Sequence, residues 1–140
     1  LQDKGRNYLI FVLAATNKPW RLDIGFIRRF QKRIYIPPPD KEMRKQAFQH
    51  YLSRFRVSAD VDFDKLAELT EGYSFSDIKE VVLDAYMATV REIFKRGSVT
   101  DKPREITMQD ILSALSRRKP SISKQLLDLY HEWASKFGAV

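Results

Sequence analysis

VLAATNKPWRLDIGFIRRFQKRIYIPPP, residues 12–39, is the stretch that decides the fold. Residues 8–14 are continuously apolar and rich in β-forming side chains, a pattern typical of a strand that is buried on both faces of a parallel sheet. Residues 33–36 predict a second short strand, which the prolines at positions 37–39 stop. Between the two strands we expect a polar tip and a short helix over residues 22–30, with Asp23 capping its start.

Polar side chains in this stretch are candidate functional residues. Asn17 follows the carboxyl end of the first predicted strand, where functional groups of open α/β sheets gather, so it is well placed to hold a water or a phosphate oxygen. The alternative for Asn17 is a simple Asx-turn. Arg28 and Arg29 end the short helix, and exposed guanidinium groups offer paired hydrogen bonds to phosphate. The alternative for these arginines is a solvated basic edge.

The sequence from Asp40 onward predicts a series of helices. The first is expected over residues 41–55, and the second from Asp62 or nearby Asp60 to a C-cap at Gly72. Two more are expected from a capping box at Ser74 and Asp77 to Gly97, and from a second capping box at Thr107 and Asp110 to the basic run 117–119. The last is expected from Ser121 or Ser123 to Gly138. The side chains expected to face inward, at three- and four-residue steps, are Met43, Ala47, Phe48, Tyr51, Leu52, Phe55, Phe63, Leu66, Ala67, Leu69, Ile78, Val81, Val82, Ala85, Tyr86, Val90, Ile93, Phe94, Met108, Ile111, Leu112, Leu115, Leu126, Leu127, Tyr130, Trp133 and Phe137.

The composition describes a globular chain with a basic surface. Apolar residues make up 44% of the 140 residues and the net charge is +7, an excess that favours acidic partners but is more simply explained by solvated helix faces. There is no cysteine, and His50 and His131 lie in no metal-ligand pattern, so no disulfide and no metal site are expected. No apolar run approaches the ~20 residues that span a bilayer, and no signal peptide is visible. An intracellular protein without a transmembrane segment is expected. The chain begins at Leu1, as a fragment would.

The motifs, taken together at this spacing, resemble the AAA+ ATPases. LAATN (residues 13–17), IRRF (27–30) and RIYIPPPD (33–40) resemble the second region of homology of that superfamily, and TEGYSFSDI (70–78) resembles its T-x-G-[YF]-[ST]-G-[AS]-D-[LI] lid segment. The resemblance implies an α/β plus α fold, in which strands four and five of a P-loop NTPase sheet are followed by a helical lid domain and a C-terminal helix.

The same resemblance implies a division of the chain. Residues 1–39 would be the C-terminal part of the large α/β subdomain, residues 40–120 the helical lid, and residues 121–140 a helix that packs back on the large subdomain. Pro19-Trp20, RRKPSIS (117–123) and the final W-x-x-x-F-G resemble the meiotic clade, which contains ESCRT-disassembling and microtubule-severing ATPases. Only residues 97–106 stand where the eukaryotic ESCRT ATPases carry a β insertion, so the chain is most similar to the archaeal cell-division version.

The resemblance assigns catalytic roles to the first subdomain. Asn17 matches sensor 1, which orients the water that attacks the γ-phosphate. Arg28 and Arg29 match the arginine fingers, which reach the nucleotide bound by the neighbouring subunit of a ring. The implied partners are therefore further copies of the same protein, in a ring expected to be a hexamer.

The resemblance also implies a nucleotide-facing surface on the lid. Ala47 and Tyr51 match positions that lie against adenine, and Phe75 and Ser76 match the lid turn that faces the nucleotide. Phe75 departs from the glycine usual at its position. The implied cofactor is ATP or ADP with Mg²⁺. The sequence contains neither a G-x-x-x-x-G-K-[ST] loop nor an acidic Walker B strand, so the phosphate and metal ligands are expected outside this chain, which alone is expected to be inactive.

The implied function is disassembly of ESCRT-III-type filaments, in the cytoplasm and at membranes reached through partners. Microtubule severing is the alternative within the same clade. A basic helical nucleic-acid-binding module is an alternative from the charge, suggested by residues 28–33 and 117–119. The aromatic residues fall mostly on the predicted core stripes rather than between the basic ones, so no nucleic-acid partner is expected. A lid that serves only as an interaction domain is a further alternative, against which Asn17 and both arginines argue.

Overall fold

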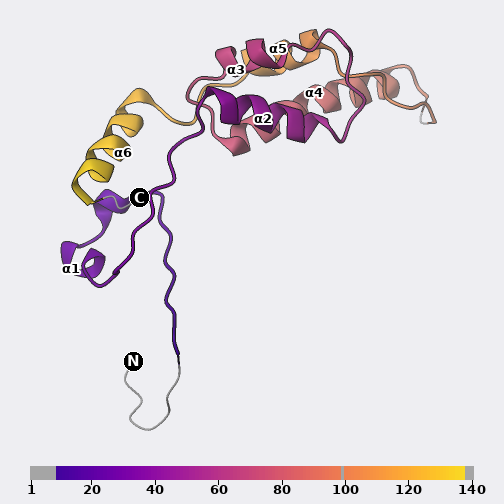
Figure 1. Cartoon of the computed structure of the whole chain (residues 1–140). Coiled ribbons are helices and arrows are strands. Elements are labelled where there is room, and N and C mark those ends of the chain that lie inside the picture. The colour runs from indigo at the N-terminus through magenta and orange to yellow at the C-terminus, as the bar shows by residue number, and fades with distance from the viewer. Residues whose placement is uncertain (1–8, 99, 138–140) are drawn as a thin grey trace.

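The computed structural model describes residues 9–98 and 100–137. The elements in chain order are η1 (Pro19–Arg21), α1 (Ile24–Ile27), α2 (Lys41–Leu52), α3 (Phe63–Leu69), α4 (Phe75–Lys95), α5 (Met108–Ser116) and α6 (Lys124–Phe137). Helices α2 to α5 pack together, whereas α6 lies apart from them beside η1 (Figure 1). The predicted polar segment 1–7, Tyr8 of the first strand and the helix end at Gly138 lie outside the described residues.

The helices of the packed group begin at the predicted capping residues. Asp40 accepts a hydrogen bond from the Met43 amide at 2.8 Å, and Asp62 caps α3 in the same way. Ser74 with Asp77, and Thr107 with Asp110, form complete capping boxes at the starts of α4 and α5. Each box supplies acceptors to backbone N–H groups that have no partner within the first turn of a helix.

The core lies between α2, α3, α4 and α5. Its buried members are Ala47, Phe48, Leu52, Leu66, Tyr73, Ile78, Val81, Val82, Ala85, Ile106, Ile111 and Ala114. The loop between α2 and α3 is tied to the loop between α4 and α5 by one parallel bridge, between Val57 and Ile106. Three side chains predicted to face inward do not: Met43, Leu69 and Phe94 are 41%, 46% and 65% exposed. Each sits at the margin of an apolar stripe, where helical periodicity does not distinguish buried from exposed positions.

The two predicted strands are not formed as sheet strands among the described residues. The segments around Leu13 and Ile36 are extended but have no hydrogen-bonded neighbour, and these side chains are 97% and 83% exposed. The expectation of burial on both faces was therefore wrong for this structure. A parallel strand acquires its hydrogen bonds and its burial only from adjacent strands and covering helices.

The short helix in the opening stretch is also smaller than predicted. The helix predicted over residues 22–30 is reduced to α1, which η1 precedes, and the Asp23 side chain at the N-cap of α1 accepts no hydrogen bond from the backbone. Helix α2 ends at Leu52 rather than at Phe55. Both differences are at element ends, where a turn more or less changes little energy.

Arg44 is a buried cation that joins α2 to α3. It is 7% exposed. Its Nη2 and Nε donate to the Ala67 carbonyl at 3.0 and 3.3 Å, and its Nη1 donates to the Pro39 carbonyl at 2.9 Å. The Arg44 guanidinium thus holds the end of α3 and the segment that leads into α2 together.

The turn between α3 and α4 holds the connector that leads to α6. Gly72 has φ +81°, and a Cβ there would meet the Ile122 carbonyl oxygen at 3.0 Å. The Ile122 amide donates to the Gly72 carbonyl at 3.2 Å, and Ser121 donates to Asp77 through both its amide and its hydroxyl. Burial raises the pKa of Asp77, but hydrogen bonds from Ser121 and Ser74 outweigh it and hold that pKa below its usual value.

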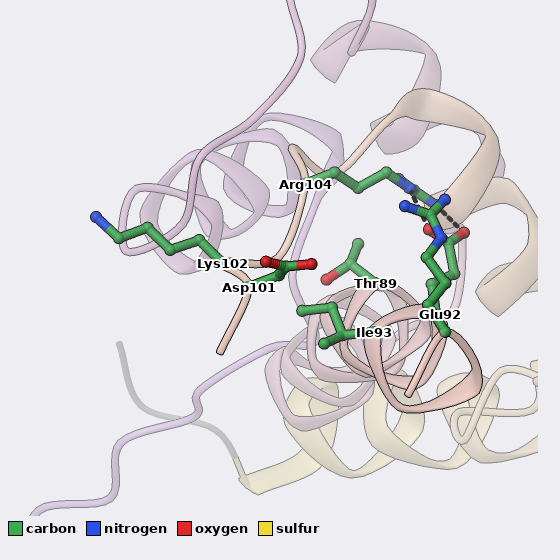
Figure 2. Close-up of a pocket in the computed structure, with 7 residues that line it drawn as sticks. Thr89, Glu92, Ile93, Asp101, Lys102 and Arg104 are labelled. Atoms are coloured by element: carbon green, nitrogen blue, oxygen red, sulfur yellow. Dashed lines mark hydrogen bonds and ion pairs between the residues drawn. The ribbon is translucent and has the colours of Figure 1, made fainter. Parts of the chain in front are cut away.

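Arg104 ties the loop between α4 and α5 to both helices (Figure 2). It donates to both carboxylate oxygens of Glu92 at 2.8 Å, and to the two oxygens of Asp110 at 2.6 and 2.9 Å. The hydrogen bonds from Arg104 lower the pKa of Asp110 and of Glu92. This loop is therefore held by a charge network in addition to the packing of the buried Ile106.

Replacing Arg44 by methionine should lower the free energy of unfolding by about 1.5–3 kcal/mol, the usual contribution of hydrogen bonds to a charged group. The carbonyls of Pro39 and Ala67 would lose their donor at a buried position. Urea unfolding followed by circular dichroism measures the change. The control is Arg54→Met at an exposed arginine just beyond α2, which should cost less than about 0.5 kcal/mol. Equal losses in the two variants would contradict the assignment.

Asp110→Asn should reduce the acid sensitivity of the fold. Because the folded-state pKa of Asp110 lies below its unfolded value, the carboxylate stabilises the fold above that value, and this contribution is lost as the pH falls through the folded pKa. We expect the unmodified chain to lose stability below about pH 4. The variant should be less stable by about 1 kcal/mol at pH 7, because Arg104 is partly exposed, and should show a shallower decline in acid.

The matched control for this titration is Asp101→Asn, at an exposed carboxylate in the same loop. Its unfolding free energy, measured by urea denaturation from pH 7 to pH 2.5, should follow that of the unmodified chain. Parallel curves for Asp110→Asn and the unmodified chain would show that the Arg104 network does not set the acid response.

Candidate functional site

A hollow of about 370 Å³ lies against one face of α2 and the start of α4. It is lined by Met43, Gln46, Ala47, His50, Tyr51 and Phe75. The residues from α2 recur at three- and four-residue steps, which places them on one side of the helix. Phe75 is the first residue of α4 and contributes the wall from a second element.

The hollow is apolar at its base and polar at its edge. Ala47 is buried, so its methyl group forms a small, flat floor. The ring centroids of His50 and Tyr51 lie 5.4 Å apart, with the rings edge to face. Gln46 supplies an amide, which donates to Glu42 at 3.4 Å. The lining residues include no lysine, arginine or carboxylate, so the hollow suits a flat, uncharged group with hydrogen-bonding edges.

The structure brings together three of the residues that the sequence placed at the nucleotide. Ala47, Tyr51 and Phe75 line the same hollow, although Phe75 is distant from the other two in sequence. Ser76 follows Phe75 but is exposed and does not line the hollow. The side chains of Ala47 and Tyr51 are also those that pack on the helical core, so the hollow is anchored to the rigid part of the molecule.

Asn17, Arg28 and Arg29 lie elsewhere, in the part of the chain that carries η1, α1 and α6 (Figure 1). The Asn17 carbonyl accepts a hydrogen bond from the Tyr130 hydroxyl of α6 at 2.7 Å. The Asn17 side chain is exposed. Arg28 and Arg29 are exposed as well, and within the described part of the chain neither takes part in an ion pair. The structure therefore does not unite these residues with the hollow.

Aromatic side chains hold α6 against this first part of the chain. The ring centroids of Trp20 and Tyr130 lie 5.1 Å apart in a T-shaped arrangement, and those of Tyr35 and Tyr130 lie 6.4 Å apart. Burial raises the pKa of the Tyr35 phenol. These contacts position the backbone of Asn17, because the hydroxyl that it binds belongs to the central ring of the cluster.

Met43, Gln46 and His50 are lining residues that sequence reasoning missed. Met43 was expected in the core, and His50 was considered only as a metal ligand and given no role. The signal was nevertheless in the sequence: all three lie within one turn of Ala47 or Tyr51 on the same side of α2.

A second hollow, of about 310 Å³, lies beside the loop that Arg104 secures (Figure 2). Its lining residues are Thr89, Glu92, Ile93, Arg96, Asp101, Lys102 and Arg104. Figure 2 shows Lys102 extending away from the other labelled side chains. Because Glu92 and Arg104 form an ion pair with each other, these two side chains stabilise the loop.

The part of the chain that the structure describes comprises residues 9–98 and 100–137. No group of three or more histidine, cysteine, aspartate or glutamate side chains could hold a metal ion there. Within the same residues no helix combines the length and the apolar character that crossing a membrane requires.

Comparison with known proteins matches residues 60–113 to the AAA+ lid domain. The chain is 45% identical to cell division protein C of Sulfolobus acidocaldarius over 140 residues, which is all of this chain and 37% of that protein. It is 38% identical to vacuolar protein sorting-associated protein 4 of Dictyostelium discoideum, over 92% of this chain and 38% of that protein. It is 36% identical to the katanin p60 ATPase-containing subunit A1 of Arabidopsis thaliana, over 98% of this chain and 28% of that protein.

A solved structure has the same arrangement of elements. The AAA domain of FIGL-1 in complex with ADP superposes with a TM-score of 0.79 at 34% sequence identity, over 89% of this chain and 44% of that one. The chain thus spans less than half of the length of each of these proteins. Residues 60–113 match the AAA+ lid domain, and the chain as a whole is similar to AAA+ ATPases of the meiotic clade.

Proposed function

We propose that this chain supplies the sensor, arginine-finger and lid part of an AAA+ ATPase that works as a ring and disassembles ESCRT-III-type filaments. The observation that carries the proposal is the hollow in which Ala47, Tyr51 and Phe75 meet. The similar AAA domain of FIGL-1 has been solved with ADP bound, which supports a nucleotide as the ligand of this face of the lid.

In this proposal the lid contacts the nucleotide through its base. Ala47 and Tyr51 lie against the adenine, while Phe75 and Ser76 belong to the turn that faces the nucleotide. No lysine or arginine lines the hollow, so the phosphates of ATP or ADP and their Mg²⁺ ion are bound mainly by residues outside this chain. Ser76 acts from the adjacent exposed surface rather than from inside the hollow.

Asn17, Arg28 and Arg29 act in this proposal at the boundary between subunits. Asn17 orients the attacking water at the nucleotide of its own subunit. Arg28 and Arg29, which are exposed, reach the nucleotide of the adjacent subunit in a ring, proposed to be a hexamer. An arginine supplied in this way stabilises the charge that develops on the transferred phosphoryl group, and raises the rate by a factor of about 10³–10⁵ in well-characterised NTPases.

There are two candidates for the polymer on which the ring acts. Similarity to cell division protein C and to vacuolar protein sorting-associated protein 4 favours filaments of the ESCRT-III type, in the cytoplasm and at membranes reached through partners. Similarity to a katanin subunit favours microtubules instead. Within the first candidate, the short connection over residues 97–106 supports the cell-division form, because the eukaryotic ESCRT ATPases carry a β insertion at that place.

The finger assignment is tested by mixing subunits of the full-length protein. A subunit carrying Arg28→Ala or Arg29→Ala is mixed with a subunit that lacks its Walker B glutamate, and ATP hydrolysis is followed by phosphate release. The mutant should fail to restore activity, because it cannot supply an arginine to its neighbour. Arg54→Ala, at an exposed arginine near the end of α2, should restore activity as the unmodified subunit does. Recovery with Arg28→Ala and with Arg29→Ala would overturn the assignment.

The purified 140-residue chain should neither bind ATP tightly nor hydrolyse it, because the sequence contains no phosphate-binding loop. Isothermal titration with ATP and Mg²⁺, together with a phosphate-release assay, measures both properties. Turnover that depends on magnesium and survives repeated purification would show that the chain holds a complete active site.

A further inference from the structure

Phe75 differs from the other residues of the hollow in where it comes from and in what its ring contacts. It is the first residue of α4, whereas the remaining lining residues belong to α2. Its side chain is 42% exposed and does not belong to the helical core. The ring is a large apolar surface at the edge of a hollow, and the packing of the helices does not account for it.

The backbone at Phe75 is held firmly even though its side chain is partly exposed. Ser74 and Asp77 form the capping box on either side of it, and Asp77 also accepts hydrogen bonds from Ser121. These bonds fix the direction in which the Phe75 side chain leaves the backbone. Little conformational entropy of the turn would therefore be lost when a ligand packs against the ring.

The chemistry of the hollow selects the part of a ligand that can lie beside Phe75. Met43 and Phe75 are each about two-fifths exposed, at 41% and 42%, and Ala47 provides a buried methyl floor between them. An anionic group would gain no lysine or arginine partner in the hollow, since none lines it. A flat, uncharged heteroaromatic group would bury apolar surface and could use the polar edges of Gln46 and Tyr51.

We propose that Phe75 is a base-binding residue that stacks on the base of the bound nucleotide, opposite the face of α2 formed by Ala47 and Tyr51. The inference rests on the proposed function, because it takes the ligand of the hollow to be a nucleotide. It goes further in making the binding free energy depend on an aromatic ring at a position where the family usually has glycine. Contacts with the base then contribute part of the binding free energy that would otherwise come from the phosphates.

The test uses the full-length protein and compares matched substitutions on one helix. Phe75→Ala removes the ring from the hollow, and Phe94→Ala removes an exposed ring from the far end of α4. Binding of ADP is measured by isothermal titration. Phe75→Ala should weaken ADP binding about 5-fold to 100-fold, the range expected for loss of one base–aromatic stack. Phe94→Ala should bind ADP as tightly as the unmodified protein.

Phe75→Trp provides a spectroscopic readout that a structural role for the ring would not produce. It should restore ADP binding, and the emission of the added indole, taken as the difference from the unmodified protein, should fall when ADP is added. Unchanged or tighter ADP binding by Phe75→Ala would overturn the proposal, and so would an indole emission that does not respond to ADP. Failure of the unmodified protein to bind ADP at all would instead overturn the proposed function. Thermal melts confirm that each variant is folded.

Discussion

The arrangement of the molecule depends on the hydrogen bonds that the Asp77 carboxylate accepts. This carboxylate closes the capping box at the start of α4, and the same group accepts hydrogen bonds from Ser121 on the way to α6. Directly beside it, Phe75 faces the hollow. One side chain thus sets the first turn of the longest helix, the wall of the candidate site and the attachment of the connector. Because the hydrogen bonds are to the ionised form, they are strongest when the carboxylate is charged.

The helical part could be predicted from the sequence because its determinants are local. Asp40, Asp62, Ser74 and Thr107 each bind a backbone amide within three residues, and such pairs can be read from spacing alone. The two strands could not be predicted in the same way. Their residues are apolar and β-forming, yet a strand exists only beside another strand, and that partner is not specified by the segment itself.

The candidate site was predictable in part, for a related reason. Ala47 and Tyr51 follow from the periodicity of α2, but the approach of Phe75 depends on how α4 packs across α2, which is a tertiary property. The exposure of Met43 at the hollow likewise depends on where α4 begins relative to α2. Asn17 and the arginine pair were recognisable in the sequence as unusual polar choices. They lie in the part of the chain that carries η1 and α1, and their roles stay predictions.

The extended apolar segments have a consequence for handling the protein. Leu9, Phe11 and Leu13 are 86%, 85% and 97% exposed on a backbone whose N–H and C=O groups have no ladder partner. Such an edge is a template for pairing with the same segment of another molecule, and its continuous apolar character favours aggregation. In the 140-residue chain taken by itself, we therefore expect association between molecules to begin at this segment. Preparations that begin at Pro39 would remove the segment and keep both the helical core of α2 to α5 and the hydrogen bond from Arg44 to Pro39, but α6 would lose its contacts with Trp20 and Tyr35.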